Sequence, residues 1–205
     1  MQPLTRSLSI ALLVGTVLLG VGAMFHPILP HDPSAQLRMI ASTWYFRPVH
    51  LAMLSGSALI ILGIWTRALL GATSSLLLAA LVLVSLGLCF NAIDIAFMGS
   101  AGVQLASLAQ AGNAELGTLF DSLHRVGLMT ARFGNGLVAL GGIVLSWVER
   151  QENNRWPSRL AAIAGFVGLF CVICFQEASL LILAAVTLMP GWQVATAVRG
   201  LRGAP

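Results

Sequence analysis

Long apolar stretches constrain this chain more than any other feature of its sequence. Five of them are long enough to cross a membrane as helices, at about 8–25, 49–66, 73–98, 118–147 and 159–189. A spanning helix needs about 20 mainly apolar residues, because the hydrocarbon layer is about 30 Å thick and a helix rises about 1.5 Å per residue. We therefore predict an all-α, polytopic integral membrane helical bundle with five transmembrane helices, formed by residues 1–205 as a single transmembrane domain.

Composition and charge narrow the class of protein further. Hydrophobic residues make up 58% of the chain and charged residues 9%, whereas about a quarter of the residues in soluble domains are charged. The cationic residues are scattered arginines, without the basic run that marks nucleic-acid binding. Cys89, Cys171 and Cys174 lie inside apolar stretches, so we interpret them as small buried residues. We expect the lipid bilayer as a partner and no nucleic acid.

Arginines near the ends of the stretches predict an orientation. The 148–159 connection contains arginines and the 99–120 connection contains none, so the positive-inside rule places 148–159 in the cytoplasm. The N-terminus with Arg6 is then cytoplasmic too, in a plasma or bacterial inner membrane. Five crossings leave Arg199 and Arg202 outside together with Arg38 and Arg47, so the arginine excess inside is small.

Aromatic and small residues indicate how such a bundle would sit and pack. Tryptophan and tyrosine prefer the membrane interface. We expect Trp65, Trp147 and Trp156 at the inner face, and Trp44, Tyr45 and Trp192 at the outer face. Small residues recur in "GNGLVALGG" at 134–142 and "AGFVG" at 164–168, which favours close approach of helices.

The first outer connection predicts a short interfacial helix near 33–46. Asp32 is a good helix cap and Pro33 suits the first helical position. Five apolar residues then fall on one face at helical spacing: Leu37, Ile40, Ala41, Trp44 and Tyr45. We expect the 99–120 connection to lie flat beside this helix, with Asn113 capping the fourth span, so that the two form a lid.

Polar residues that are energetically costly inside a membrane interrupt the apolar stretches, all at a similar depth in the bilayer. The stretch "SLHRVGLMTARFGNGLVALGGIVLSW" at 122–147 carries four of them in its first half. Counting the helical rise from the inner end of each helix places one or more ionisable residues of every helix in the outer part of the membrane. These are His26, His50, Asp94, His124 with Arg132, and Glu177. Because intramembrane charges usually face the bundle interior, we expect them to converge on a polar cavity that opens to the outer face.

This predicted cluster assigns roles to its members. The candidates for ligand or cofactor contact are His50, His124, Glu177, His26 and Asp94. Arg132 and Arg125 would balance charge, and Asn91, Asn135 and Gln176 would provide a polar lining. The histidines and carboxylates are suitable ligands for zinc, iron or copper, so a transition metal ion held by His26, His50, His124, Asp94 and Glu177 is one hypothesis. No short motif such as HExxH is present to support it.

A second hypothesis is a b-type haem held by His50 and His124 that exchanges electrons with quinone. The segment "SLHRVG" at 122–127 resembles the Ser-x-x-His-Arg segment in the cytochrome b membrane-anchor subunit of succinate dehydrogenases. That resemblance implies that Ser122 and Arg125 contact quinone or the haem propionates. It covers about six residues of the fourth stretch, and the later histidine-rich helix of that family is missing from this sequence.

Two further hypotheses need no cofactor. Asp94 and Glu177 beside Arg132 would suit a proton- or ion-coupled transporter, although the chain lacks the inverted repeat common in secondary carriers. Alternatively, Arg132 simply pairs with Glu177, and the protein is a non-catalytic accessory or scaffold subunit that binds partner membrane subunits. Whether the protein is an enzyme stays open. We prefer binding of a ligand or cofactor, with His50, His124 and Glu177 as the direct contacts.

Overall fold

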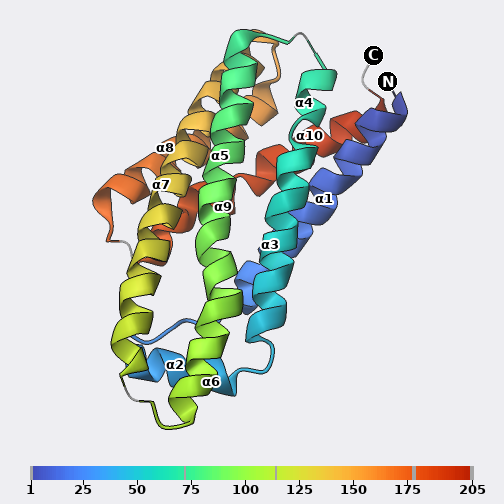
Figure 1. Ribbon diagram of the computed structural model, residues 1–205. Helices are drawn as coiled ribbons and strands as arrows, with labels where there is room; N and C mark the ends of the chain where they lie inside the picture. The colour runs from blue at the N-terminus through green and yellow to red at the C-terminus, as the bar shows by residue number, and fades with distance from the viewer. Residues whose placement is uncertain (1, 72, 114, 177–178, 204–205) are drawn as a thin grey trace.

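The structure is a computed structural model that describes residues 2–71, 73–113, 115–176 and 179–203. In these residues every regular element is a helix (Figure 1). In chain order they are α1 (Gln2–Phe25), α2 (Pro33–Ser42), α3 (Phe46–Gly63), α4 (Thr66–Leu69), α5 (Ser75–Phe97), the π-helix η1 (Met98–Gly102), α6 (Val103–Gln110), α7 (Leu116–Gln151), α8 (Arg155–Cys174), the 3-10 helix η2 (Leu180–Leu183), α9 (Ala184–Leu188) and α10 (Pro190–Arg202).

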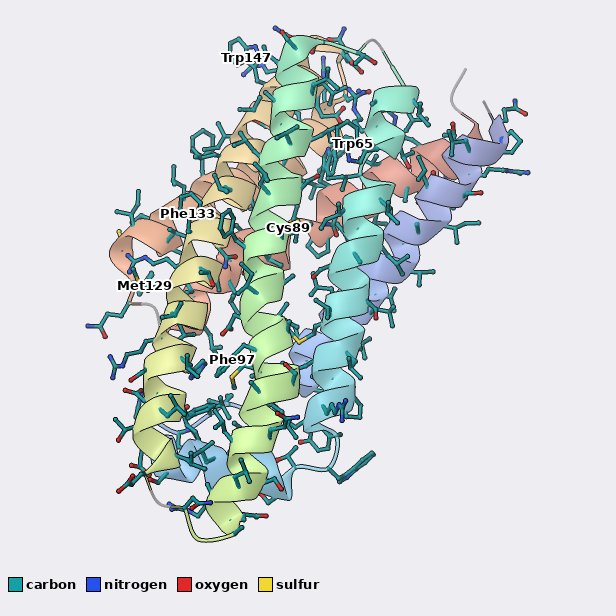
Figure 2. All side chains as sticks on the ribbon, viewed as in Figure 1. Trp65, Cys89, Phe97, Met129, Phe133 and Trp147 are labelled. Atoms are coloured by element: carbon teal, nitrogen blue, oxygen red, sulfur yellow. The ribbon has the colours of Figure 1, made fainter. Side chains whose placement is uncertain are left out.

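The bundle has two distinct ends. At one end α2 lies across the long helices beside α6, and we call this the cap end (Figure 1). At the other end lie α4, the connection between α7 and α8, and both chain termini, and we call this the terminal end (Figure 1). Trp147 lies toward the terminal end, whereas Phe97 lies toward the cap end (Figure 2).

Six helical segments of the described chain are long and apolar enough to cross a membrane. They are Gln2–Phe25, Phe46–Leu69, Ser75–Gln110, Leu116–Gln151, Arg155–Cys174 and Leu180–Arg202. The all-α polytopic membrane bundle that the sequence predicts is therefore confirmed, with six candidate spans in place of the five predicted. The difference lies in the last third of the chain.

The stretch expected at 159–189 is not one helix. Its first part, α8, ends at Cys174, where Phe175 takes an extended conformation with φ −111° and ψ 155°. Arg132 of α7 donates from Nε (3.1 Å) and Nη2 (2.7 Å) to the carbonyl oxygen of Val172, one of the last carbonyls of α8. Such carbonyls lack a partner inside the helix, so this arginine allows α8 to end within the bundle. Leu180–Arg202 then supplies the additional candidate span.

Glycines allow the long helices to approach one another closely. A Cβ atom on Gly134 of α7 would lie 2.5 Å from the carbonyl oxygen of Gly87 on α5, closer than side-chain carbons ever come. A Cβ on Gly165 of α8 would likewise lie 2.6 Å from the backbone nitrogen of Ile143 on α7. The small residues at 134–142 and 164–168 therefore act as predicted, by letting backbones pack directly.

The predicted interfacial helix forms, but it is shorter than expected. Asp32 caps α2, with its side chain accepting a hydrogen bond from the Ala35 backbone across 2.6 Å, and Pro33 is the first helical residue. The helix ends at Ser42, not near residue 46, because the chain turns to bury Phe46, which is 1% exposed. Trp44 falls in this turn and is 86% exposed, so its placement on the apolar face of the helix was wrong.

The apolar face of α2 packs on protein at the cap end. Leu37 and Ile40 are each 2% exposed, and they belong to a second hydrophobic core. Its other buried members are Phe46, Met98, Ala106 and Phe120, from α3, η1, α6 and α7. The connection expected to lie flat at 99–120 is mostly helix instead, since α5 continues through η1 into α6 as far as Gln110. The 36 residues of Ser75–Gln110 span about 54 Å, more than the hydrocarbon thickness, so part of this segment extends beyond it.

Candidate functional site

Two histidines meet where α1 ends and α3 begins. The Nε2 atoms of His26 and His50 lie 3.2 Å apart, and Nδ1 of His50 lies 2.8 Å from the carbonyl oxygen of Phe46. A carbonyl oxygen only accepts hydrogen bonds, so Nδ1 of His50 donates, and its Nε2 is left with a lone pair that faces His26. We call His26 and His50 the histidine pair.

Aromatic packing holds the histidine pair in place. The Phe46 ring packs against His50 with centroids 4.3 Å apart, and its centroid lies 5.9 Å from that of His26. His50 is 2% exposed, and His26 is half-buried. Burial lowers the pKa of His26, because desolvation penalises its charged form, and a hydrogen bond with the Pro27 backbone opposes this effect. His26 is therefore held mainly as the neutral imidazole, the form that binds metal ions.

A small cavity reaches His50, one member of the histidine pair, from between α3 and the end of α5. Its volume is about 160 Å³, and its polar lining consists of Arg47, His50 and Ser100. Arg47 and Ser100 are exposed, whereas His50 is buried. Gly99 permits the close approach of the two helices here, since a Cβ at that position would lie 2.8 Å from the Cβ of His50.

His124 and Asp94 lie in the same half of the bundle as the histidine pair. His124 is 9% exposed, packs on the Phe120 ring with centroids 5.3 Å apart, and is close enough to His26 to interact with it electrostatically. Asp94 faces Gly127 across the α5–α7 contact. Its Oδ1 atom is buried and has no hydrogen-bond partner in the part of the chain that the structure describes.

Two of the three residues predicted as polar lining, Asn91 and Asn135, form a contact between two helices. Nδ2 of Asn135 donates to Oδ1 of Asn91 across 2.9 Å, joining α7 to α5. Each amide also donates to a backbone carbonyl of its own helix, Asn91 to Gly87 and Asn135 to Ala131. These bonds satisfy much of the hydrogen-bonding capacity of the two side chains inside the bundle.

Those of the remaining candidate residues that the structure describes do not join the histidine pair. Arg132 contacts Val172 at the end of α8, and Arg125 pairs with Asp121 at 2.8 Å on the surface. Gln176 is exposed in the break after α8. Glu177 lies outside the described residues. Among residues 2–71, 73–113, 115–176 and 179–203, no group of three or more His, Cys, Asp or Glu side chains is arranged to hold a metal ion.

A buried charge cluster that the sequence did not predict lies at the terminal end. Nε of Arg67 donates to Oε1 of Glu149 at 2.7 Å, and Nη2 of Arg67 lies 2.7 Å from Oε2 of Glu152. Glu149 also accepts hydrogen bonds from Trp192 (3.1 Å), Asn154 (2.7 Å) and Arg199 (3.5 Å). Charges at the ends of apolar stretches usually face water, so the burial of Arg67 and Glu149 is not apparent from the sequence.

Trp192 shows the effect of the additional span most directly. It was expected at the outer interface, but it is 0% exposed and bonded to Glu149 at the terminal end. Sequence alone offers one signal for this contact, the glutamate at the end of an apolar stretch in "SWVER". This signal does not reveal that Glu149 binds Arg67 of α4 and Trp192 and Arg199 of α10.

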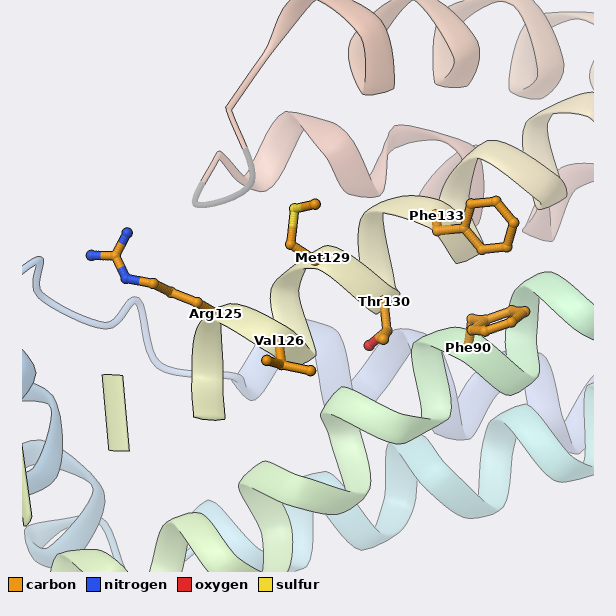
Figure 3. A pocket seen from close by; sticks show the side chains of 6 residues that line it. All are labelled: Phe90, Arg125, Val126, Met129, Thr130 and Phe133. Atoms are coloured by element: carbon orange, nitrogen blue, oxygen red, sulfur yellow. The ribbon is translucent and has the colours of Figure 1, made fainter. Parts of the chain in front are cut away.

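A shallow apolar groove runs along the outside of α5 and α7 (Figure 3). Its volume is about 400 Å³, and it is lined by Phe90, Arg125, Val126, Met129, Thr130 and Phe133. The rings of Phe90 and Phe133 meet edge to face, with centroids 5.0 Å apart. Val126, Met129 and Phe133 are each more than half exposed, as expected for side chains that contact lipid.

Comparisons with known proteins assign no family to the chain. No family model, curated protein sequence or solved structure matches it. The resemblance of residues 122–127 to the succinate dehydrogenase anchor subunit therefore receives no further support. The fold defines the class: this is a polytopic integral membrane protein with six candidate spans.

Proposed function

We propose that this membrane protein binds one transition metal ion, such as Zn²⁺ or Cu²⁺, at the histidine pair. The observation that carries the proposal is the 3.2 Å separation of the Nε2 atoms of His26 and His50. Zinc lies about 2.0–2.1 Å from a histidine nitrogen, so two nitrogens on one tetrahedral ion are about 3.3 Å apart. The two ligating nitrogens on opposite sides of a haem iron would instead be about 4 Å apart, which is twice the metal–nitrogen bond length.

The surroundings of His50 also suit a metal ligand. Metal-binding histidines usually donate their second ring nitrogen to a carbonyl or carboxylate, which fixes the tautomer and the ring orientation. The bond from Nδ1 of His50 to the Phe46 carbonyl has this arrangement. The Nε2 lone pair is then available, and little rearrangement is needed to exchange the hydrogen bond with His26 for a bond to a metal ion.

The size of the adjoining cavity favours an ion over a larger cofactor. About 160 Å³ is less than the roughly 300 Å³ at which pockets for small organic molecules begin, but it holds several water molecules. Water or a small ligand in this cavity would complete the coordination of an ion that two histidines hold. The haem hypothesis, which paired His50 with His124, has no comparable support.

A proton- or ion-coupled role is the second candidate, and it rests on Asp94. A buried carboxyl oxygen without a hydrogen-bond partner is costly, unless the group binds a proton or a cation. Asp94 is one helical turn outward from the Asn91–Asn135 pair and in the same half of the bundle as the histidine pair. Exchange of protons between these groups is the mechanism that this candidate implies.

Metal titration of the purified protein tests the proposed function. Protein in mild detergent is stripped with chelator and titrated with Zn²⁺ and Cu²⁺ by calorimetry, with Co²⁺ absorption as a measure of coordination geometry. We expect about one bound ion per chain, lost in His26→Ala/His50→Ala and retained in His31→Ala, which alters an exposed histidine. Circular dichroism verifies that each variant is folded. Equal binding by wild type and the double variant, or none by either, would refute the metal site and leave the transport and scaffold alternatives.

A further inference from the structure

The sixth candidate span changes how the arginines are distributed between the two ends. With an even number of crossings both termini belong to one end, as they do in Figure 1. The terminal end then carries Arg6, Arg67, Arg150, Arg155, Arg159, Arg199 and Arg202. The two arginines of the tail, which five crossings would have placed opposite Arg6, lie on the same side as it.

The described acidic residues of the terminal end are paired with arginines inside the buried charge cluster. Glu149 and Glu152 are the described acids at this end, and they bind Arg67 and Arg199. Five exposed arginines remain, and the structure records no ion pair for any of them among its described residues: Arg6, Arg150, Arg155, Arg159 and Arg202. We call these five the arginine rim. The rim therefore carries uncompensated positive charge.

Tryptophans place the arginine rim at the depth of lipid headgroups. Trp147 is 59% exposed and Trp156 is 71% exposed, both near the connection between α7 and α8. The guanidinium carbon of Arg159 lies 5.3 Å from the centre of the Trp156 ring. Exposed tryptophan is typical of the membrane–water interface, so the neighbouring arginines reach the phosphate region.

The cap end has a different balance of charge. Arg38 lies 3.9 Å from Asp32, and Arg125 lies 2.8 Å from Asp121. Arg47 and Glu115 are also exposed at this end. The described part of the cap end thus contains three arginines and three acidic residues, whereas no described acid remains to neutralise the arginine rim.

We infer that the terminal end is the cytoplasmic face and that the arginine rim binds the headgroups of anionic phospholipids. The cytoplasmic leaflet carries a negative surface potential, which attracts basic residues beside a transmembrane helix. Guanidinium groups bind phosphate through two parallel hydrogen bonds, and every cationic side chain in this protein is arginine, with no lysine. This inference does not depend on the metal site.

Retention of lipid through purification tests the proposed partner. Protein in mild detergent is incubated with equal amounts of phosphatidylglycerol and phosphatidylcholine, and bound lipids are counted by native mass spectrometry. We expect Arg150→Gln/Arg155→Gln/Arg159→Gln to retain at least threefold less phosphatidylglycerol than wild type. Arg38→Gln/Arg47→Gln at the cap end should match wild type, and the lysine triple at 150, 155 and 159 should keep most of the lipid. Equal retention by the glutamine triple, or no preference for the anionic lipid, would overturn the inference.

Cysteine labelling tests the assigned face independently. In a background with Cys89, Cys171 and Cys174 replaced by alanine, exposed glutamines at the two ends are changed, Gln110→Cys and Gln151→Cys. An impermeant maleimide should label Gln110→Cys in intact cells and Gln151→Cys only after lysis. Labelling of Gln151→Cys in intact cells would place the rim outside and overturn the inference whatever the lipid result.

Discussion

The Nε atom of Arg67 lies 2.7 Å from Oε1 of Glu149, and neither side chain exposes any area. The two residues are 82 positions apart in the chain, and the contact joins α4 to the end of α7. Trp192 and Arg199 of α10 donate to the same carboxylate. Glu149 therefore fixes the last helix of the bundle against two others.

The first prediction concerns this carboxylate. Glu149→Gln removes the fully buried one of the two carboxylates that neutralise Arg67 and leaves only Glu152 as its countercharge. Removing one partner of a buried pair costs about 3–5 kcal/mol. We expect the Tm in detergent to fall by about 10 °C, measured by circular dichroism. Glu115→Gln, which changes an exposed acid, should leave the Tm unaltered. Similar Tm values for the two variants would show that the cluster adds little to stability.

The second prediction concerns packing between α5 and α7. Gly134→Ala puts a Cβ 2.5 Å from the Gly87 carbonyl oxygen, so the two backbones must separate. Overpacking of this kind costs about 1–3 kcal/mol. Gly20→Ala is the matched control, because a Cβ there has nothing within 4 Å, and alanine favours the helix by up to about 1 kcal/mol. Thermal unfolding should therefore shift in opposite directions, and equal shifts would contradict this packing.

The third prediction concerns Arg132 as the cap of α8. Arg132→Met removes both hydrogen bonds to the partly buried Val172 carbonyl. Leaving such an acceptor unsatisfied costs about 1 kcal/mol, the lower end of the range for buried groups. Hydrogen exchange should accelerate at the amides of residues 170–174, the last turn of α8. Arg125→Met, which breaks the exposed pair with Asp121, should leave exchange in α8 unchanged. Unchanged exchange in Arg132→Met would mean that α8 ends there for another reason.

The fourth prediction is a loss of stability in acid that depends on His26. Burial lowers the pKa of His26 in the folded protein, whereas the unfolded chain titrates near pH 6.5. Below that pH the unfolded state binds more protons, so the free energy of unfolding falls as pH drops from about 6.5 toward the folded pKa. In metal-free protein, the Tm difference between pH 7.5 and pH 5.5 should be smaller in His26→Gln than in wild type.

His50 and His124 lie near His26, so the comparison between variants isolates the contribution of His26. His31→Gln, in which an exposed histidine is changed, should retain the full Tm difference of the wild type. An identical Tm difference in His26→Gln and wild type would show that proton binding at His26 is not coupled to folding.

Local features of the fold were readable from the sequence because each depends on neighbours in the chain. Asp32 and Pro33 start α2 as predicted, since a cap acts on the first turn that follows it. The glycines at 134–142 and 164–168 mark close helix contacts. The absence of a side chain permits close backbone approach whichever helix packs there. Counting the rise of each helix also brought His26 and His50 to similar depths, and the structure places them in contact.

The tertiary structure alone decided which helix faces which. Hydropathy is averaged over a window of residues, so it does not reveal a short break such as the one after Cys174, which lies between two apolar segments. In the folded protein, Arg132 of α7 binds the Val172 carbonyl at this break. The sequence by itself determined that the chain is a helical membrane bundle, because each apolar stretch is long enough to span the membrane on its own. The pairing of Glu149 with Arg67 depends on how far each helix is rotated and how deep it sits in the bundle. Packing across the whole bundle fixes both, and no local sequence pattern encodes them.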